Sequence, residues 1–453
     1  MLLGAKRQTP CLLGWVEVAA GAITGVLLLH LVAGCSFLTK PTSVLPSSSP
    51  TPGHTPTVSA PSPTATTSAG GPGMPLTLTL WLPPEMLPST QGTGQFVEDL
   101  SRAFMLENPQ ARVEVVPKAP SGLGGIANFL MTTHAVVPAR LPDIVALDAS
   151  EIRKIAQSGV LIPLDDALSD AYWDDLFPWA VEAVTVNGER LGMPFQVDIA
   201  FLVYDVSLTE TPPKAWYDLA SVKGKYIFPA GRGDGSSADA LLLHYFALGG
   251  NFGDNPTRPS LDTALLARVL GNYRSAMELG IVPDVVRTLR TLDDCWSSYL
   301  AGNAGLTNAS SLQYGQDRAT LPTARYAPIP TANGESVTVA RSWAWAVTAR
   351  DRAHQEMAVR YVALALQPER LVQWSRASYH LPTHRSVLDL AVEDVDYRAF
   401  LAEQLEHARP YPSVAHYYEV QDAISLAIED VLDGVTTPER AAITAAASLA
   451  RLR

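Results

Sequence analysis

The chain has 453 residues, of which 47% are hydrophobic and 17% are charged, and its formal net charge is −12. That length suits two domain-sized hydrophobic cores, and the apolar content excludes a generally disordered chain. The excess of acidic residues argues against a broad phosphate-binding surface, so nucleic acid is not expected as a partner.

The amino-terminal segment carries an export pattern. Lys6 and Arg7 precede an apolar stretch over residues 18–33, which ends in small residues just before Cys35. A basic start, a short apolar segment and small residues before a cleavage point are typical of secretory signal peptides. The competing interpretation, a retained transmembrane helix, needs about 20 apolar residues, more than this stretch provides. We therefore predict a signal peptide over residues 1–34.

The next segment has the composition of a linker. Residues 36–75 consist mostly of Pro, Ser and Thr, and Lys40 is their only charged residue. Such a segment cannot bury a hydrophobic core and is expected to be extended and partly polyproline-like. Residues 35–75 are thus predicted to form a tether that starts at Cys35, and a folded region is expected to begin near Leu76.

The chain contains three cysteines, Cys11, Cys35 and Cys295. Cleavage before Cys35 would leave Cys295 as the one remaining thiol besides the proposed anchor, so neither an internal disulfide nor a cysteine-based zinc site is expected. Cys295 follows Asp293 and Asp294, whose negative charges raise a thiol pKa, and this favours a structural role over a nucleophilic one. Zinc-binding, phosphate-loop and nucleophile-elbow motifs do not occur, and we predict no cofactor and no metal.

Strand and helix patterns alternate through the first part of the folded region. Residues 76–82 alternate with period 2 and predict a strand, and apolar residues recur at helical spacing over residues 96–104. Strands are predicted again over residues 113–115 and 141–147, and a helix over residues 152–156. Strands that alternate with helices predict an α/β sheet with crossover connections.

The second part of the folded region has fewer strands. A buried strand is predicted over residues 199–204, helices over residues 238–248 and 264–279, and a further strand over residues 343–348. The rest is mainly helical, and the last helix begins at the capping residue Thr437, which is followed by proline at the first helical position.

Short motifs from Leu76 to the C-terminus occur in an order that is typical of one protein family. They are residues 104–109 (FMLENP) with the strand at 113–115, 141–144 (LPDI) through 156–165 (AQSGVLIPLD), 186–194 (VNGERLGMP) through 202–205 (LVYD), 212–216 (PPKAW), 381–383 (LPT) and 434–441 (GVTTPERA). In this order the motifs resemble family 1 of the extracellular solute-binding proteins of ABC importers, the group that contains maltose-binding protein.

A second resemblance concerns the export signal. Residues 32–35 (VAGC) are similar to the lipobox of bacterial lipoproteins, a branched apolar residue and two small residues before cysteine. The resemblance implies cleavage before Cys35 and attachment of diacylglycerol, with acyl chains such as palmitate, to this residue. The protein is then expected to be lipid-anchored on the extracytoplasmic face of the cell membrane.

The family resemblance implies an α/β fold of the periplasmic-binding-protein-like clamshell type (type II), with two lobes, several hinge crossings and a helical C-terminal part. Lobe 1 is expected over about residues 76–197 and 343–388, and lobe 2 over about residues 199–340 and 391–453, within a solute-binding domain of residues 76–453. The crossings are expected near residues 197–199, 341–344 and 386–390.

Three polar residues are candidates for ligand contacts. Asp148 directly follows the apolar strand of residues 144–147, and open α/β sheets bind ligands beyond the carboxyl ends of their strands. The resemblance places Asp148 and Ser150 in a substrate-binding segment, whereas the alternative for Asp148 is a helix N-cap. Asp198 lies at a predicted hinge crossing and needs a partner for its charge, either ligand hydroxyls or a hinge salt bridge.

Aromatic residues are candidates for stacking on sugar rings. Trp81, at the end of the first strand, is a stacking platform or a core residue. Period 2 puts Trp343 and Trp345 on the same face of one strand, and Trp343 is the preferred cleft residue because it is nearer the hinge. The resemblance also implies that Tyr417 stacks on ligand. Arg341 stands where the family often has Gly, and it is either a cleft cation or, as favoured here, a hinge ion-pair partner.

The implied function is that of a monomeric receptor, not an enzyme. It would capture a small solute, with a sugar or oligosaccharide as the expected ligand, close its lobes and dock on the permease subunits of an ABC transporter. The alternative is a lipid-anchored extracellular glycan hydrolase that uses a carboxylate pair such as Asp148 and Asp198. An adhesin presented on the tether is a third and weaker alternative.

Overall fold

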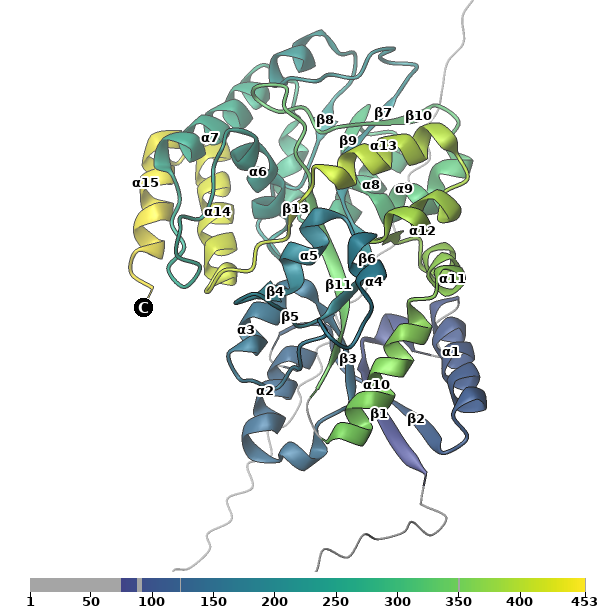
Figure 1. Cartoon of the computed structure of the whole chain (residues 1–453). Helices are drawn as coiled ribbons and strands as arrows, with labels where there is room; N and C mark the ends of the chain where they lie inside the picture. Colours follow the sequence, from purple (N-terminus) through teal and green to yellow (C-terminus); the bar gives the residue numbers. More distant parts are fainter. Residues whose placement is uncertain (1–74, 88–91, 123, 349–350, 453) are drawn as a thin grey trace, which may run out of the picture. The chain divides into compact units, whose positions relative to one another are not determined.

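The computed structural model describes residues 75–87, 92–122, 124–348 and 351–452 (Figure 1). The predicted signal peptide, Cys35 and almost all of the predicted tether lie outside the described residues. Among the helices that the structure describes, none combines the length and the apolar character needed to cross a membrane.

The larger sheet has seven strands. Its main path runs β12-β6-β11-β3-β1-β2, and β13 pairs with the first residues of β11. The strand β1 is parallel to its neighbours β2 and β3, whereas β11 is antiparallel to β3 and β6. The bounds are β1 (Leu76–Leu82), β2 (Ala111–Pro117), β3 (Ile144–Asp148), β6 (Met193–Asp198), β11 (Val339–Val347), β12 (Leu381–Pro382) and β13 (Arg409–Pro410).

Helices cover both faces of this sheet. Figure 1 shows α1, α10 and α11 on one side and α2, α3 and α5 on the other. Aromatic contacts fasten the first group, because Phe104 lies 5.2 Å from Tyr361 and Phe96 lies 5.3 Å from Trp374, measured between ring centroids. The bounds are α1 (Thr93–Glu107), α2 (Ile126–Val136), α3 (Ile152–Ala156), α5 (Pro178–Val184), α10 (Arg352–Ala365) and α11 (Pro368–Ser378).

The smaller sheet has four strands in the order β10-β7-β9-β8. The central strand β7 is antiparallel to β10 and β9, and β8 is parallel to β9. Successive residues of β7 pack into two different cores. Phe201 packs on Phe400 of α13 (Val395–Glu406), whereas Leu202 belongs to the core built with α6 (Ser236–Ala247), α7 (Thr263–Glu278), α14 (Tyr417–Leu432) and α15 (Pro438–Leu449). The strand bounds are β7 (Ala200–Asp205), β8 (Tyr226–Ile227), β9 (Leu306–Ser310) and β10 (Ala324–Ala327).

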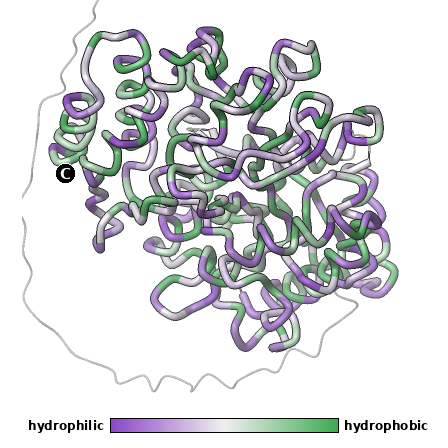
Figure 2. Tube along the Cα trace, turned by 90° about the horizontal axis from the view of Figure 1, so that it is seen from above, coloured by the Kyte–Doolittle hydropathy of each residue, from purple (hydrophilic) through white to green (hydrophobic). Residues whose placement is uncertain are grey.

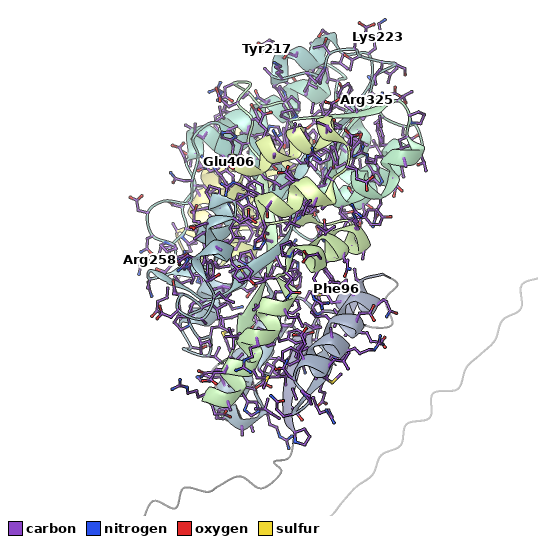
Figure 3. The ribbon with its side chains drawn as sticks, turned by 45° about the vertical axis from the view of Figure 1, so that its right-hand side comes forward. Phe96, Tyr217, Lys223, Arg258, Arg325 and Glu406 are labelled. Atoms are coloured by element: carbon purple, nitrogen blue, oxygen red, sulfur yellow. The ribbon has the colours of Figure 1, made fainter. Side chains whose placement is uncertain are left out.

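The helices that belong with the smaller sheet come from the middle and the end of the chain. They are α6 (Ser236–Ala247), α7 (Thr263–Glu278), α8 (Leu292–Leu300), α9 (Ser311–Asp317), α13 (Val395–Glu406), α14 (Tyr417–Leu432) and α15 (Pro438–Leu449). The remaining regular elements are α4 (Asp170–Asp174), α12 (Arg385–Ala391) and the hairpin of β4 (Thr185–Val186) and β5 (Glu189–Arg190). Figure 3 marks the two regions with Phe96 from α1 and Arg325 from β10.

The chain passes between the sheets at two strands that lie side by side. The strand β6 ends at Asp198 in the larger sheet, and β7 begins two residues later in the smaller one. The strand β11 follows β10 of the smaller sheet along the chain and belongs to the larger sheet, where Val339 pairs with Arg409 of β13 and Arg341 pairs with Asp198 of β6. Asp198 and Arg341 therefore face the junction of the two sheets from adjacent strands.

The predicted elements recur in the structure with small shifts of their ends. The strand predicted over residues 199–204 is β7, and the helix predicted over residues 238–248 is α6. Thr437 caps α15, since its side chain accepts a hydrogen bond from the Arg440 amide. In Figure 2 hydrophobic and hydrophilic residues alternate along the Cα trace, as expected for helices and strands with one buried face.

Cys295 lies in the core of the second region. Its side chain is fully buried in α8, and burial, together with the charge of Asp294, raises the pKa of its thiol. A buried, protonated thiol is a poor nucleophile, which agrees with the structural role favoured by the sequence.

Candidate functional site

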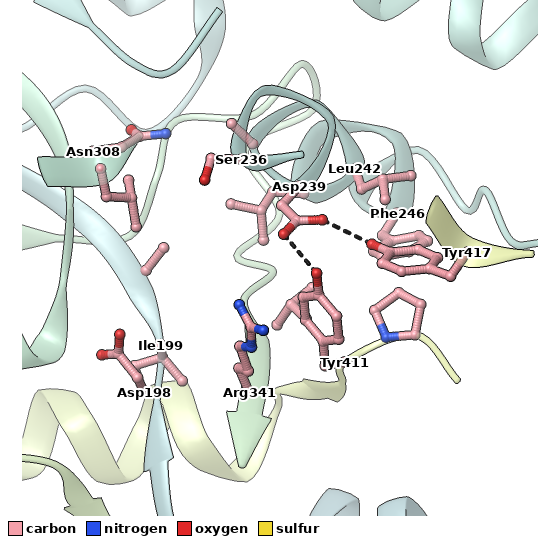
Figure 4. Close-up of a pocket in the computed structure, with 16 residues that line it drawn as sticks. Asp198, Ile199, Ser236, Asp239, Leu242, Phe246, Asn308, Arg341, Tyr411 and Tyr417 are labelled. Carbon is pink, nitrogen blue, oxygen red and sulfur yellow. Dashed lines mark hydrogen bonds between the residues drawn. The ribbon is translucent and has the colours of Figure 1, made fainter. Parts of the chain in front are cut away.

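A cavity of about 160 Å³ lies at the junction of the two sheets. Its walls come from the β6–β7 crossing, the start of β11, helix α6 and the segment that leads into α14 (Figure 4). The lining residues are Asp198, Ile199, Ala200, Ser236, Asp239, Ala240, Leu242, Leu243, Phe246, Leu292, Asn308, Val339, Arg341, Tyr411, Pro412 and Tyr417. Apolar walls with a few converging polar groups are typical of small-molecule sites.

Asp239 is the centre of a hydrogen-bond cluster in this cavity. Its carboxylate accepts bonds from the hydroxyls of Tyr411 and Tyr417, both at 2.8 Å, and from the Gln421 amide nitrogen at 2.9 Å. The Gln421 nitrogen also donates to the Tyr411 oxygen at 3.1 Å. The cluster holds the two tyrosine rings, 5.4 Å apart and nearly perpendicular, against one side of the cavity.

Electrostatic interactions within the cluster determine which groups donate hydrogen bonds and which accept them. Burial and the negative charge of Asp239 raise the pKa of Tyr411 and of Tyr417, so both hydroxyls keep their protons and donate. Burial also raises the pKa of Asp239, although the three donors and the charge of Arg341 act in the opposite direction. The donors and Arg341 therefore offset part of the cost of removing the Asp239 carboxylate from water.

Arg341 places a cation beside these tyrosines. Its Nε donates to an Asp148 carboxylate oxygen at 2.9 Å, and its guanidinium carbon lies 5.0 Å from the Tyr411 ring centroid. Burial disfavours the guanidinium charge, but the negative charges of Asp148 and Asp239 and the hydrogen bond to Asp148 act with the other surrounding groups to outweigh it and raise the Arg341 pKa. The side chain is still 56% exposed because the cavity opens onto it. Arg341 is therefore both an ion-pair partner and a cation in the cavity wall.

In Figure 4, Asp198 lies on the other side of Arg341 from Tyr411. One oxygen of its carboxylate accepts hydrogen bonds from the Ser311 hydroxyl at 2.5 Å and from the Leu312 amide at 3.2 Å. These donors at the start of α9 stabilise the charge next to the hinge crossing. The salt bridge that the sequence offered as one alternative for Asp198 is not among the ion pairs of the described residues.

Asp148 and Ser150 lie beside the cavity rather than in its lining. Asp148 ends β3 and caps the short helix of Ala149–Glu151, because it accepts hydrogen bonds from the Ser150 amide at 3.0 Å and from its hydroxyl at 2.7 Å. The N-cap considered for Asp148 is present, and Asp148 is also the partner in the ion pair considered for Arg341. A ligand contact by Asp148 or Ser150 stays a prediction.

The predicted aromatic residues are divided by the fold. Tyr417 lines the cavity, whereas Trp81 is 6% exposed, with the Lys118 ammonium 4.8 Å from its ring centroid. Trp345 is buried and stacks on Phe195 at 4.8 Å, which makes it the core member of its pair. Trp343 is partly buried against the same core. Stacking of Trp81, Trp343 or Tyr417 on a ligand stays a prediction.

Sequence reasoning missed several residues of the cavity. Asp239 had no signal beyond its place in a predicted helix, and Tyr411 none beyond its neighbouring prolines. Asn308 has no signal beyond the Asn-Ala-Ser pattern of a glycosylation sequon, yet it lines the cavity and is 1% exposed. Within the part of the chain that the structure describes, no group of three or more His, Cys, Asp or Glu residues is placed to hold a metal ion.

The family of the chain follows from comparison with known sequences. A family model described as bacterial extracellular solute-binding protein matches residues 100–399. The chain belongs to this family. Its members are extracellular proteins that bind solutes, which places the function of this chain outside the cytoplasm.

A curated relative of this solute-binding protein is the maltotriose-binding protein of Pyrococcus abyssi (strain GE5 / Orsay). It is 29% identical over 126 residues, which span 27% of this chain and 28% of the relative. The match thus covers little more than a quarter of the relative's own length.

Solved structures resemble this solute-binding protein over most of its length. The maltose-bound MalE3 of T. maritima has a TM-score of 0.67 at 18% identity, covering 83% of this chain and 99% of its own. The cyclic alpha-maltosyl-1,6-maltose binding protein of Arthrobacter globiformis has a TM-score of 0.69 at 19% identity, covering 83% and 98%. These likenesses confirm the predicted fold class, the two-lobed α/β architecture of solute-binding proteins.

Proposed function

We propose that this solute-binding protein captures a sugar or short oligosaccharide outside the cell and delivers it unchanged to an ABC importer. The observation that carries the proposal is the cavity built on Asp239, Tyr411 and Tyr417, with Arg341 beside it. Sugar hydroxyls donate to carboxylates and accept from guanidinium groups, and sugar C–H faces pack on aromatic rings. The cavity offers these three kinds of contact together.

The relatives support the same ligand class. The curated relative and the solved structures are named for maltotriose, maltose and related glucans. They are binding proteins rather than enzymes, and they give no support to a glycan hydrolase. We propose that this chain, too, is not an enzyme and that it acts as a monomer docked on permease subunits.

Ligand capture is proposed to work through two lobes with the bounds expected from the sequence. In support, β1, β2, β3, β6 and β12 fall within residues 76–197 and 343–388 apart from the last residue of β6, and β7 to β10 fall within residues 199–340. A ligand in the junction cavity would contact elements of both sheets. Closure would then be favoured by the contacts that the ligand makes only when the lobes meet.

We expect the purified protein to bind at least one glucan saturably. Isothermal calorimetry with maltotriose, maltose, glucose and glucuronate as titrated ligands measures this. Ligand at 100 times its dissociation constant should also stabilise the fold by about 2.7 kcal/mol, seen as a raised unfolding midpoint. Chromatography of the recovered sugar should show no cleavage. Binding of a different solute class alone would contradict the sugar assignment, and turnover would contradict the proposed absence of catalysis.

We further propose that the receptor is a lipoprotein anchored through Cys35. The lipobox over residues 32–35 supports this proposal, and the tether of residues 36–75 would let the binding domain move near its permease. At about 3.1 Å per residue in an extended conformation, a tether of this length reaches on the order of 120 Å. Anchoring confines the receptor to the membrane surface and so raises its effective concentration at the transporter.

Cys35→Ser should release the protein from membranes without weakening sugar binding. The substitution removes the acyl chains that hold the protein at the bilayer, and the folded region begins some 40 residues later. Fractionation of cells that express either form, with calorimetry on the purified proteins, checks both parts. Cys295→Ser is the matched control and should stay with the membranes. Equal membrane retention of Cys35→Ser would show that lipid on this residue is not the anchor.

A further inference from the structure

One polar atom in the wall of the junction cavity has no hydrogen-bond partner among the described residues. It is the amide nitrogen of Asn308, on β9, whose side chain is almost fully buried. A buried donor without an acceptor costs about 1–3 kcal/mol relative to one that is satisfied. In Figure 4 this nitrogen lies on the side of Asn308 that faces Ser236 and Asp239, across the cavity.

The orientation of the Asn308 amide is set by a buried tyrosine. The Tyr226 hydroxyl donates to the Asn308 carbonyl oxygen at 2.7 Å, and Tyr226 itself is fully buried. Burial raises the pKa of Tyr226, so its hydroxyl keeps its proton and needs an acceptor. If the amide turned over, the hydroxyl proton would face an NH2 group instead of an oxygen and would lose its acceptor. Tyr226 thereby keeps the amide nitrogen, not the oxygen, toward the cavity.

We propose that Asn308 is a specificity-determining residue of the binding site, that it donates a hydrogen bond to an acceptor oxygen of the bound saccharide, and that Tyr226 is the positioning residue that orients it. The inference rests on the proposed function, since it assigns a ligand contact within the same cavity. A site built around a buried donor rejects ligands that lack the matching oxygen, because the donor is then left unpaired. The preferred ligand should therefore carry a hydroxyl or ring oxygen at this position.

The structure offers matched variants for the test. Asn308→Asp keeps an oxygen that accepts from Tyr226 but removes the donor from the cavity. Tyr226→Phe keeps the donor but frees the amide to turn. Tyr273→Phe is the control, because Tyr273 is an equally buried tyrosine of the same core whose hydroxyl has no partner among the described residues. Thermal unfolding of each variant shows that it folds.

Calorimetric titration with maltotriose, and with glucose and maltose if maltotriose does not bind, gives the readout. Asn308→Asp should weaken binding by roughly tenfold or more, Tyr226→Phe by a smaller factor, and Tyr273→Phe not at all. A set of maltotriose analogues that each lack one hydroxyl or carry carbon in place of the ring oxygen adds a readout that a structural role would not move. One analogue should bind poorly to the wild type yet lose nothing further in Asn308→Ala.

The outcomes separate this inference from the proposed function. Wild-type binding with unchanged affinity in Asn308→Asp would overturn the inference and leave the sugar receptor standing. Equal losses in Tyr226→Phe and Tyr273→Phe would overturn the positioning role, because the two tyrosines differ in the bond to Asn308. Absence of binding by the wild type to every saccharide tried would overturn the proposed function and the inference together.

Discussion

Acidification from pH 7 to pH 4 is expected to destabilise the folded chain by about 6 kcal/mol through two buried histidines. Burial lowers the pKa of His244 to about 3 and that of His384 to about 4, the second despite the nearby negative charge of Asp175. Both side chains are 2% exposed, and one ring nitrogen of each has no partner among the described residues. Each imidazole is thus held neutral by the fold.

The sign follows from proton binding. The pKa of an unfolded histidine is about 6.5, so below that pH the unfolded chain binds protons that the folded chain excludes. Stability is complete above pH 6.5 and falls as the pH drops toward the lower folded values. At pH 4 each histidine contributes a loss of about 3 kcal/mol, from 1.36 kcal/mol per pKa unit. Together these losses are comparable to the total stability of many domains, about 5–15 kcal/mol.

Urea unfolding at pH 7, 5.5 and 4 measures this effect. The double variant with His244→Phe and His384→Gln should lose much less stability between pH 6.5 and pH 4, whatever its stability at pH 7. His407→Gln, which changes an exposed histidine, is the control and should keep the full acid-dependent loss. Parallel pH profiles of the wild type and the double variant would show that other groups cause the acid sensitivity.

Asp239→Ala is expected to weaken maltotriose binding by about 100-fold, or about 2.8 kcal/mol. The substitution removes the acceptor that orients both cavity tyrosines, so the rings lose their fixed positions along with the carboxylate. It also leaves Tyr411, Tyr417 and Gln421 without their shared acceptor, which should lower the free energy of unfolding by about 1 kcal/mol for each lost bond.

Calorimetry for affinity and urea unfolding for stability separate the two effects. Asp422→Ala is the matched control. It also removes one carboxylate, but this one lies on α14 and forms an exposed ion pair with Arg232. Such surface pairs contribute little to stability, so this variant should bind and unfold like the wild type. Unchanged affinity in Asp239→Ala would mean that the junction cavity is not where the sugar binds.

Local patterns in the sequence were enough to predict the helices and strands and one edge of the candidate site. The apolar run before Asp148 predicted both its strand and its place at the strand's carboxyl end, and the structure shows β3 ending there. Period 2 likewise placed Trp343 and Trp345 on one face of β11. Which of the two is buried depends on Phe195, which comes from a different strand.

The centre of the cavity could not be predicted in this way. Asp239 looks like any polar residue on a helix until the fold brings α14 and the segment before it alongside α6. Arg341 posed a similar problem, since its two proposed roles differ only in what surrounds its guanidinium. The structure provides both surroundings, with Asp148 on one side and the cavity on the other. Tertiary contacts, not local propensity, decide these residues.

The Asp239 cluster also has a consequence for when the proposed ligand site forms during folding. Its three hydrogen bonds join Asp239 to partners 172, 178 and 182 residues further along the chain. Contacts over such separations form late in folding, because long loops must close first. The proposed binding site is therefore complete only after α14 has packed against α6. A chain truncated before Tyr411 would keep the residues of the larger sheet's strands but lack Tyr411, Tyr417 and Gln421, so ligand binding at the proposed site should require residues 411–421.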